Sequence, residues 1–460
     1  MRWHTVAGRL AVGLLSLALL GGCSAGATSS PTPSPALVTR SASPSSSPLG
    51  TPSSAPSVSE EPTSDLAWYS IGTIPVADTT IRDVVGFAKG YVAVERSRSV
   101  WFSADGRTWR EIELPFTVTE DEYGRFLDAR ARAVTTDGTQ VLVVGGYSHE
   151  PCRAPDPPNN PSTEDSTECP LYPLAWVSDD GVTWQSAYPG PQPAEPPGYD
   201  HGSEFAAAWP VPTGGWDAAL SYWGAGGSLA GRDLWHSSDG IHWAELEPAP
   251  APDLGGSPQF PSVHAGAADQ KGLRVLWQGW SDNTDPVDVP GGVPVMTLAT
   301  SPDGRSWTTV DGFAGRGAEI SAGVAPAGDL SRWVLVGASG ITEVNNRTAS
   351  VPTVWTSEDR VAWTATVLPI VAGLRGGPVT SVVLTRAGYV AVGVNWDGEG
   401  KGQFWTRLSE DGLTWVELPP VGTPGVDSDP PSVADGPAGV VGIGVSPTGS
   451  GGEAGVWQLR

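Results

Sequence analysis

A seven-residue pattern recurs six times along this chain of 460 residues. Every copy has Ser first, Asp third and Trp seventh, and all but one have Gly fourth. The intervals between copies vary from 52 to 75 residues, which is too irregular for a rod-like solenoid but suits a supersecondary unit with loops of variable length. The copies are SADGRTW (103–109), SDDGVTW (178–184), SSDGIHW (237–243), SPDGRSW (301–307), SEDRVAW (357–363) and SEDGLTW (409–415).

The residue types in this pattern predict a tight turn between two strands. Gly readily adopts positive φ, the Ser and Asp side chains can accept hydrogen bonds from the backbone of the turn, and Trp can pack over the hairpin. A structural role is therefore predicted for Ser103, Asp105, Trp109, Ser178, Asp180, Trp184, Ser237, Asp239, Trp243, Ser301, Asp303, Trp307, Ser357, Asp359, Trp363, Ser409, Asp411 and Trp415.

The sequence around each copy predicts a unit of four antiparallel strands. Apolar runs such as GYVAVE (90–95) and RWVLVGA (332–338) precede the pattern, and a shorter strand follows its Trp. Pairs of strands begin near residues 81, 130, 205, 262, 320, 379 and 432, and helical patterns are nearly absent.

The two ends of the chain predict how these units are joined. The last strand pair reaches Trp457 without a fourth strand, whereas residues 65–75 (DLAWYSIGTIP) look like a fourth strand with no pattern before it. We therefore predict an all-β fold, a seven-bladed β-propeller of four-stranded antiparallel blades in which residues 65–75 complete the C-terminal blade and leave no open sheet edge. A six-bladed propeller is the alternative.

The repeated pattern is similar to the Asp-box, or BNR repeat, of sialidase-like β-propellers, and the resemblance covers residues 65–460. That family's usual form, S-x-D-x-G-x-T-W, has one more residue between Asp and Gly, and the Asp359-Arg360 copy departs further. The resemblance implies that the boxes are structural and lie away from the active centre. We use the name Asp-box for the six copies below.

The resemblance does not extend to the catalytic residues of sialidases. Known sialidases use an Arg triad, a Tyr nucleophile paired with Glu and an Asp acid/base, and they usually begin with Arg-Ile-Pro, which this chain lacks. Its nearest inner-strand arginines, Arg82, Arg130 and Arg132, cannot be matched to the triad one by one. No catalytic residue is predicted.

Metal and cofactor motifs are also missing from the sequence. There is no HExxH, GxSxG, GxGxxG or GxxxxGK[ST] motif. The run SDNTDPVD (281–288) has three Asp, but it lacks EF-hand spacing, so a solvated loop is favoured over calcium binding. We predict no cofactor and no metal site, with structural calcium left open, and a surface or packing role for His236 and His242.

The N-terminal sequence predicts export and lipid anchoring. Residues 1–22 have a positively charged start and a short apolar run, typical of a signal peptide, and Leu20-Gly21-Gly22-Cys23 resembles a bacterial lipobox. The alternative is an ordinary signal peptide with a chance Cys. Residues 23–64 are rich in Ser, Pro and Thr and predict a disordered tether behind a lipidated Cys23, and residues 65–460 form the propeller domain.

The net charge of the chain limits its possible binding partners, and the two cysteines other than Cys23 indicate its redox compartment. A net charge of −24 at pH 7 argues against nucleic acid or anionic lipid as partners, so the membrane is contacted through the lipid anchor only. Cys152 and Cys169 are expected to form a disulfide in an oxidising compartment. We expect a monomer on the extracytoplasmic face of the cell membrane.

Loop lengths predict which face binds a ligand. The turns inside the blades are short on one face, while the other face carries the long segments 116–129, 147–173, 185–204, 280–293, 339–351 and 419–431. Strands ending on that face carry Tyr147, Trp223, Trp280 and Trp396 as candidate ligand-binding aromatics, although such rings can also serve only to cap the blades.

These features predict a non-catalytic cell-surface lipoprotein that binds a glycan, a wall polymer or a protein through its long-loop face. The first alternative is an exported sialidase-like glycoside hydrolase, motivated by the repeats. The second is a protein that assembles or senses an envelope complex. The sequence does not distinguish the last of these from the main reading.

Overall fold

The computed structural model describes sixteen segments of the chain. Contacts group Thr63–Arg460 into one compact unit. The described segments are residues 66–76, 81–95, 97–116, 126–149, 171–187, 203–224, 227–246, 262–270, 274–282, 293–310, 317–325, 331–344, 347–397, 402–419, 432–445 and 453–460.

The described residues are all-β and contain no helix. Accordingly, no described segment is a helix long and apolar enough to cross a membrane. The strands of the first half are β1 (Trp68–Ile74), β2 (Asp83–Phe87), β3 (Gly90–Val94), β4 (Ser99–Ser103), β5 (Arg110–Glu113), β6 (Phe126–Thr136), β7 (Val141–His149), β8 (Leu171–Ser178), β9 (Gln185–Ala187), β10 (Ser203–Pro210), β11 (Trp216–Gly224), β12 (Gly227–Ser237) and β13 (Trp243–Glu245).

The second half continues the same succession of strands. Its elements are β14 (Ser262–Ala268), β15 (Arg274–Asp282), β16 (Val293–Ser301), β17 (Thr308–Val310), β18 (Glu319–Val324), β19 (Trp333–Val344), β20 (Arg347–Ser357), β21 (Thr364–Val367), β22 (Arg375–Thr385), β23 (Gly388–Trp396), β24 (Gly402–Ser409), β25 (Val416–Glu417), β26 (Ser432–Gly436), β27 (Gly439–Val445) and β28 (Ala454–Leu459).

The described strands form seven four-stranded antiparallel sheets. In six of them the strands pair in chain order, from β2-β3-β4-β5 to β22-β23-β24-β25. The other sheet has the order β1-β28-β27-β26, so it joins both ends of the described chain, with Trp68 opposite Leu459 and Ile74 opposite Ala454.

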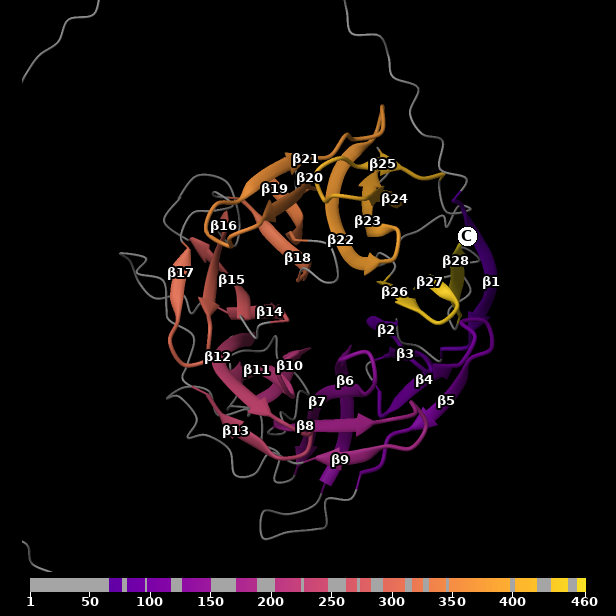
Figure 1. Cartoon of the computed structure of the whole chain (residues 1–460), viewed down its shortest axis with the longest axis vertical. Helices are drawn as coiled ribbons and strands as arrows, with labels where there is room; N and C mark the ends of the chain where they lie inside the picture. Colours follow the sequence, from indigo (N-terminus) through magenta and orange to yellow (C-terminus); the bar gives the residue numbers. More distant parts are fainter. Residues whose placement is uncertain are drawn as a thin grey trace, which may run out of the picture. The chain divides into compact units, whose positions relative to one another are not determined.

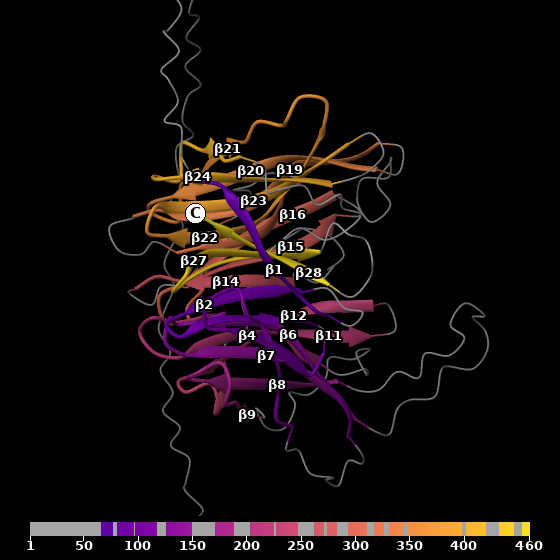
Figure 2. The ribbon, with the colours of Figure 1, turned by 90° about the vertical axis from the view of Figure 1, so that its right-hand side faces the viewer.

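The sheets are arranged around a common centre, as in a β-propeller (Figure 1). The first strands of neighbouring sheets contact one another in the cyclic order β2, β6, β10, β14, β18, β22, β26 and back to β2. Viewed from the side, the strands run roughly across the ring from one face to the other (Figure 2). The first strands therefore surround the centre, and the Asp-box hairpins join the third and fourth strands farther out.

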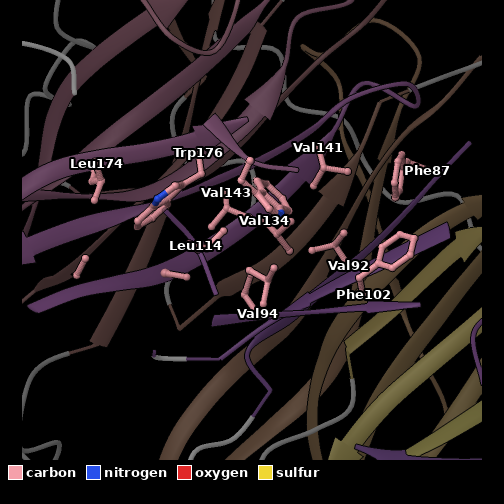
Figure 3. Close-up of a cluster of buried hydrophobic side chains, with 14 of the residues drawn as sticks. Phe87, Val92, Val94, Phe102, Leu114, Val134, Val141, Val143, Leu174 and Trp176 are labelled. Carbon is pink, nitrogen blue, oxygen red and sulfur yellow. The ribbon is translucent and has the colours of Figure 1, made fainter. Parts of the chain in front are cut away.

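The hydrophobic core is divided into layers between neighbouring sheets. Figure 3 shows the layer between the β2–β5 and β6–β9 sheets, where Phe87, Val92 and Phe102 face Val134, Val143 and Trp176. Burial at these positions follows from the strands themselves, because each sheet is covered on both faces and therefore reads as nearly continuous apolar runs such as VLVV (141–144).

One predicted long segment is mostly strand. Residues 339–351 were expected to be an irregular loop, but β19 extends to Val344 and β20 starts again at Arg347, with Ser339 paired opposite Val351. Ile, Thr and Val in this stretch have high β-propensity, and only residues 345–346 lie between the two strands.

Candidate ligand-binding site

A cavity of about 490 Å³ lies among the first strands of the sheets, and we call it the polar cavity. Its lining comes from seven strands or their ends, because one or more residues are contributed at β2, β6, β10, β14, β18, β22 and β26. Small residues leave room on β10 and β14, whereas charged and hydroxyl side chains gather on the other strands. The polar lining consists of Arg82, Asp83, Arg132, Ser321, Thr380, Ser381 and Ser432.

β-Bulges place several of these residues in the lining. The register of the first strand slips between Ala131 and Ala133 in β6, and it slips again in β10, β18 and β22. A bulge inserts one unpaired residue and re-aims its side chain, which is why bulges are frequent at binding and active sites. The residues that the slips leave unpaired include Arg132, Ala206, Ser321 and Thr380, and all four line the polar cavity.

Arg132 is held by a carboxylate behind the cavity wall. Glu204, in β10, is fully buried, and its Oε1 lies 3.3 Å from Arg132 Nη1. Its Oε2 accepts a hydrogen bond of 3.0 Å from Arg130 Nε. Both arginines keep about 30% of their side-chain surface exposed. The buried carboxylate therefore forms ion pairs with two guanidinium groups, and Arg132, which lines the polar cavity, is paired by charge without a hydrogen bond to Oε1.

Asp83 is the carboxylate in the lining of the polar cavity. Its Oδ1 accepts a hydrogen bond from the backbone N–H of Val84 at 2.9 Å, and its Oδ2 accepts a long one from Val134 at 3.4 Å. Burial raises the pKa of Asp83 to about 7, although these two backbone hydrogen bonds act to lower it. Among the described residues no cation forms an ion pair with Asp83, because Arg132 is engaged by Glu204.

Arg82 lies at the start of β2, beside Asp83, and is exposed. Its carbonyl oxygen accepts a hydrogen bond from Ser432 Oγ at 3.1 Å, which ties the first strand of one sheet to the first strand of the next. Two guanidinium groups, four hydroxyls and one carboxyl group make the polar cavity suited to a hydroxyl-rich ligand with an anionic group.

A second cavity, of about 780 Å³, is lined by the opposite ends of the first strands and by the turns that follow them. Its lining is mostly apolar, including Leu66, Phe87 and Val390, with Arg386 and Asp435 as its charged members. Burial raises the pKa of Asp435, and its interaction with Arg386 opposes that effect. This second cavity shares no lining residue with the polar cavity.

The prediction that Tyr147 is an exposed, ligand-binding ring is wrong. Only 2% of its surface is exposed, because it stacks on Tyr172, its cross-strand partner, with ring centroids 5.2 Å apart, and also contacts Phe116. Tyr147 lies in β7, the second strand of its sheet, so the side chain of Tyr172 on the neighbouring strand β8 covers the Tyr147 ring.

The other predicted aromatics are only partly placed by the structure. Trp396 ends β23 and is partly exposed, packed against Val394 and Phe404. The backbones of Trp223 and Trp280 lie near the ends of β11 and β15, and their side chains lie outside what the structure describes. A ligand-binding role for these three Trp stays a prediction.

The six Asp-boxes share one hydrogen-bond pattern. In each, the Ser hydroxyl donates to the first Asp oxygen over 3.1–3.2 Å, and that oxygen accepts two further hydrogen bonds from backbone N–H groups two and three residues later. The Trp indole N–H closes the turn on the carbonyl oxygen of the fourth residue in every box except that of Trp307. One oxygen of each Asp is thus bonded within its own turn, which fits the structural role predicted for these residues.

The two histidines beside one Asp-box also bond locally. His236 Nδ1 lies 2.8 Å from the buried Asp217, and His242 Nδ1 lies 2.7 Å from Asp239 of the box. Within the described segments, no group of three His, Cys, Asp or Glu side chains could hold a metal ion.

Several predicted residues lie outside the described residues. Cys23, Cys152 and Cys169 belong to this group, as do the side chains of residues 281–288. The lipid anchor, the disulfide and a calcium-binding loop therefore stay predictions.

Sequence reasoning missed Asp83 and Glu204 as parts of a site, although it singled out the inner-strand residues Arg82, Arg130 and Arg132. One sequence feature could have indicated the site: charged residues stand in strands whose other residues are apolar or small, as in FLDARARAV (126–134) and SEFAAAW (203–209). Which of these charges meet depends on the bulges, which the sequence pattern does not reveal.

No protein-family model matches the chain, and no curated protein matches it. Among solved structures it is similar to a Trypanosoma rangeli sialidase, at 12% identity and a TM-score of 0.41, over 86% of this chain and 60% of that one. It is also similar to a GH93 α-L-arabinofuranosidase of Fusarium graminearum in complex with arabinobiose, at 14% identity and a TM-score of 0.43, over 71% of this chain and 92% of that one. An α-L-arabinanase of Penicillium chrysogenum gives 15% identity and a TM-score of 0.42, over 72% and 93% of the two chains. The chain thus spans well under two thirds of the length of the Trypanosoma rangeli sialidase.

Proposed function

We propose that this chain is an exported, non-catalytic binding protein that takes an acidic sugar of a glycan or wall polymer into its polar cavity. The observation that carries the proposal is the ion pair of Arg132 with the fully buried Glu204, which restrains a guanidinium group in the lining of the cavity. A fixed guanidinium recognises a carboxylate with little loss of side-chain entropy.

The rest of the lining favours a sugar over a smaller anion. The hydroxyl groups of Ser321 and Ser381 can donate and accept hydrogen bonds with ring hydroxyls, and that of Ser432, which donates to Arg82, can still accept one. A volume of about 490 Å³ exceeds that of a simple inorganic anion and falls within the range of small-molecule sites. We place the outer part of the glycan on the long-loop face, where Trp223, Trp280 and Trp396 would stack on further sugar rings.

The framework of this proposal is a seven-bladed propeller in which β1 completes the last blade. Its support is the pairing of β1 with β28 and the cyclic contacts of the first strands. We further propose that Cys23 carries a lipid anchor on the extracytoplasmic face of the cell membrane, that residues 24–64 act as a tether and that Cys152 and Cys169 form a disulfide. Glycans, wall polymers and envelope proteins would then be within reach of a monomeric domain.

The described lining of the polar cavity offers one carboxyl group, which favours binding over hydrolysis. Most glycosidases need a pair of carboxyl groups at the scissile bond. In the described lining of the polar cavity Asp83 is the only carboxyl group, and no Tyr is present. Glu204 is buried and already engaged by two arginines.

Titration calorimetry tests the proposal with the purified full chain. We expect glucuronic acid or N-acetylneuraminic acid to bind, and neutral glucose to bind at least about tenfold more weakly. Arg132→Gln should weaken binding of the acid by about tenfold or more, since it removes one charge-assisted hydrogen bond. Arg386→Gln is the matched control, because Arg386 lines the second cavity, and should leave the affinity as it is.

Two results would overturn the proposal. One is equal affinity for the acidic and the neutral sugar. The other is the same loss of affinity from Arg386→Gln as from Arg132→Gln.

A second candidate function is an exported glycoside hydrolase, and the position of Asp83 favours it. A carboxyl group whose pKa is about 7 can act as a general acid near neutral pH. Turnover of a panel of fluorogenic glycosides, with sialosides and arabinosides included, would support this function if Asp83→Asn abolished it. No turnover across the panel would leave the binding function.

A further inference from the structure

We propose that the polar cavity takes up its anionic ligand together with a proton, which Asp83 receives. The inference rests on the proposed function, since it concerns the same site. It adds that the affinity for the anion depends on pH, because the bound anion would otherwise face the negative charge of ionised Asp83.

The geometry places a carboxyl group where the anion must bind. Asp83 and Arg132 line the same cavity from the neighbouring strands β2 and β6, and Arg82 directly precedes Asp83. Asp83 Oδ2 reaches across to the backbone N–H of Val134, two residues beyond Arg132. An anion held by the guanidinium groups is therefore close to the Asp83 carboxyl group.

The surrounding charges leave Asp83 poorly compensated. From β6, Arg130 and Arg132 are both engaged by Glu204 of β10, which is fully buried. Arg82, which directly precedes β2, contributes the one further positive charge in the described lining, and β26 contributes only the neutral Ser432. Asp435 of β26 lines the second cavity instead.

The direction of the pH dependence follows from these contacts. Burial raises the pKa of Asp83 to about 7, so both protonation states are populated near neutral pH. A bound anion disfavours the ionised carboxylate and raises that pKa further. The complex therefore binds more protons than the free protein, and by linkage the affinity for the anion increases as the pH falls.

Protonated Asp83 also gains a hydrogen-bonding role. A neutral carboxyl group has an O–H donor, which can point to the anionic oxygen or to a ring hydroxyl of the ligand. Below a pH of about 7 the Asp83 carboxyl group therefore gains a hydrogen-bond donor and no longer repels the bound anion.

Calorimetric titration of the full chain with sodium glucuronate tests the inference, with glucose as the neutral probe. Glucuronate stays ionised throughout this range, and cationic buffers such as bis-Tris and imidazole avoid a competing anion. Between about pH 6 and about pH 8 we expect the affinity for glucuronate to fall by about fivefold to tenfold, with little change for glucose. Repeating the titration in buffers of different ionisation enthalpy should show net proton uptake of up to about one proton near neutral pH.

Asp83→Asn should raise the affinity for glucuronate at about pH 8 towards the wild-type value at about pH 6, and abolish proton uptake. Asp435→Asn is the matched control, because that partly buried carboxyl group lines the second cavity. It should leave both the pH dependence and the proton uptake unchanged. The measurement of proton uptake needs no variant, so the inference remains testable even if Asp83→Asn fails to fold.

The outcomes separate the inference from the proposed function. Glucuronate binding with a constant affinity and no proton uptake would overturn the inference and leave the proposed function in place. The same follows if Asp435→Asn, rather than Asp83→Asn, removes the pH dependence. If neither glucuronate nor N-acetylneuraminate bound at any pH, both the inference and the proposed function would be overturned.

Discussion

The Tyr91 hydroxyl donates a 2.6 Å hydrogen bond to the carbonyl oxygen of Gly439, 348 residues further along the chain. The same hydroxyl accepts a hydrogen bond of 3.0 Å from the backbone N–H of Ala438. Tyr91 belongs to the β2–β5 sheet, whereas Ala438 lies in the turn between β26 and β27 and Gly439 begins β27. One fully buried side chain therefore links the first described sheet to the sheet that contains the chain end.

Tyr91→Phe should lower the free energy of unfolding by about 1 to 2 kcal/mol, because it leaves two backbone groups without their partner. Burial raises the pKa of Tyr91 to about 12, so the wild type should lose stability as the pH rises from 10 towards 12, and the variant should lose less. Urea unfolding at several pH values measures both effects. The exposed Tyr69→Phe is the control, and an equal loss from that variant would contradict the account.

Arg360 provides a test of the Asp-box turn. It occupies the fourth box position with φ of 67°, where the other five boxes have Gly at φ of 72–77°. Arg360→Gly should stabilise the protein by about 0.5 to 1 kcal/mol, since only Gly adopts this conformation without strain. Thermal unfolding gives the comparison. A destabilised variant would show that the Arg360 side chain, which lies 3.6 Å from Asp269, contributes more than the strain costs.

The opposite substitution should be costly at Gly181. A Cβ added there would lie 2.5 Å from a ring atom of Phe102 in the core layer of Figure 3. Gly181→Ala should therefore destabilise the protein by about 1 to 3 kcal/mol through overpacking and a strained positive φ. Gly138→Ala, at a positive φ with no atom within 4 Å of the added Cβ, isolates the part due to strain alone.

The Asp-boxes should make the protein sensitive to acid. Hydrogen bonds from Thr183 and Val182 lower the pKa of Asp180 to about 2, and the pKa values of the other five box Asp residues are lowered too. A lowered pKa in the folded state adds stability at neutral pH, which is lost as the pH falls from about 4 to about 2.

Asp180→Asn should remove its share of this pH dependence, so the urea midpoint of the variant should decline less between about pH 5 and about pH 2 than that of the wild type. Asp137→Asn, in the turn between β6 and β7, is the control outside the boxes. An Asp180→Asn curve parallel to the wild-type curve would contradict the prediction.

Glu204→Gln should cost about 2 to 3 kcal/mol, because it leaves Arg130 and Arg132 without a buried counter-charge. The same variant should weaken glucuronate binding, since Arg132 loses the group that orients it. Glu358→Gln, which breaks the exposed pair with Arg332, should change stability by less than about 0.5 kcal/mol. Equal effects of the two variants on stability would rule out a buried anchoring role for Glu204.

Local signals predicted much of the strand order. Strand pairs expected near residues 205, 262 and 432 start at Ser203, Ser262 and Ser432, because apolar runs and Gly-containing turns mark strand ends directly in the sequence. Even the expected fourth strand at residues 65–75 corresponds to β1, which is Trp68–Ile74 and pairs with β28.

The polar cavity could not be predicted in the same way. Arg132 and Thr380 reach it because bulges shift the register of their strands by one residue, and such a shift reverses which face a side chain occupies. Tyr147 was assigned to the surface for a related reason, since the sequence does not show that Tyr172 lies opposite it. Contacts between segments distant in the sequence determine both the lining of the polar cavity and the burial of Tyr147.

A crystal structure of the chain with glucuronate, grown at a pH of about 6 where Asp83 is mostly protonated, tests the central claim most directly. The account predicts the ligand carboxylate within hydrogen-bond distance of the Arg132 guanidinium group and ring hydroxyls facing Ser381 or Ser432. Glucuronate bound only beside Arg386 in the second cavity, or no glucuronate in the polar cavity at saturating concentration, would contradict it.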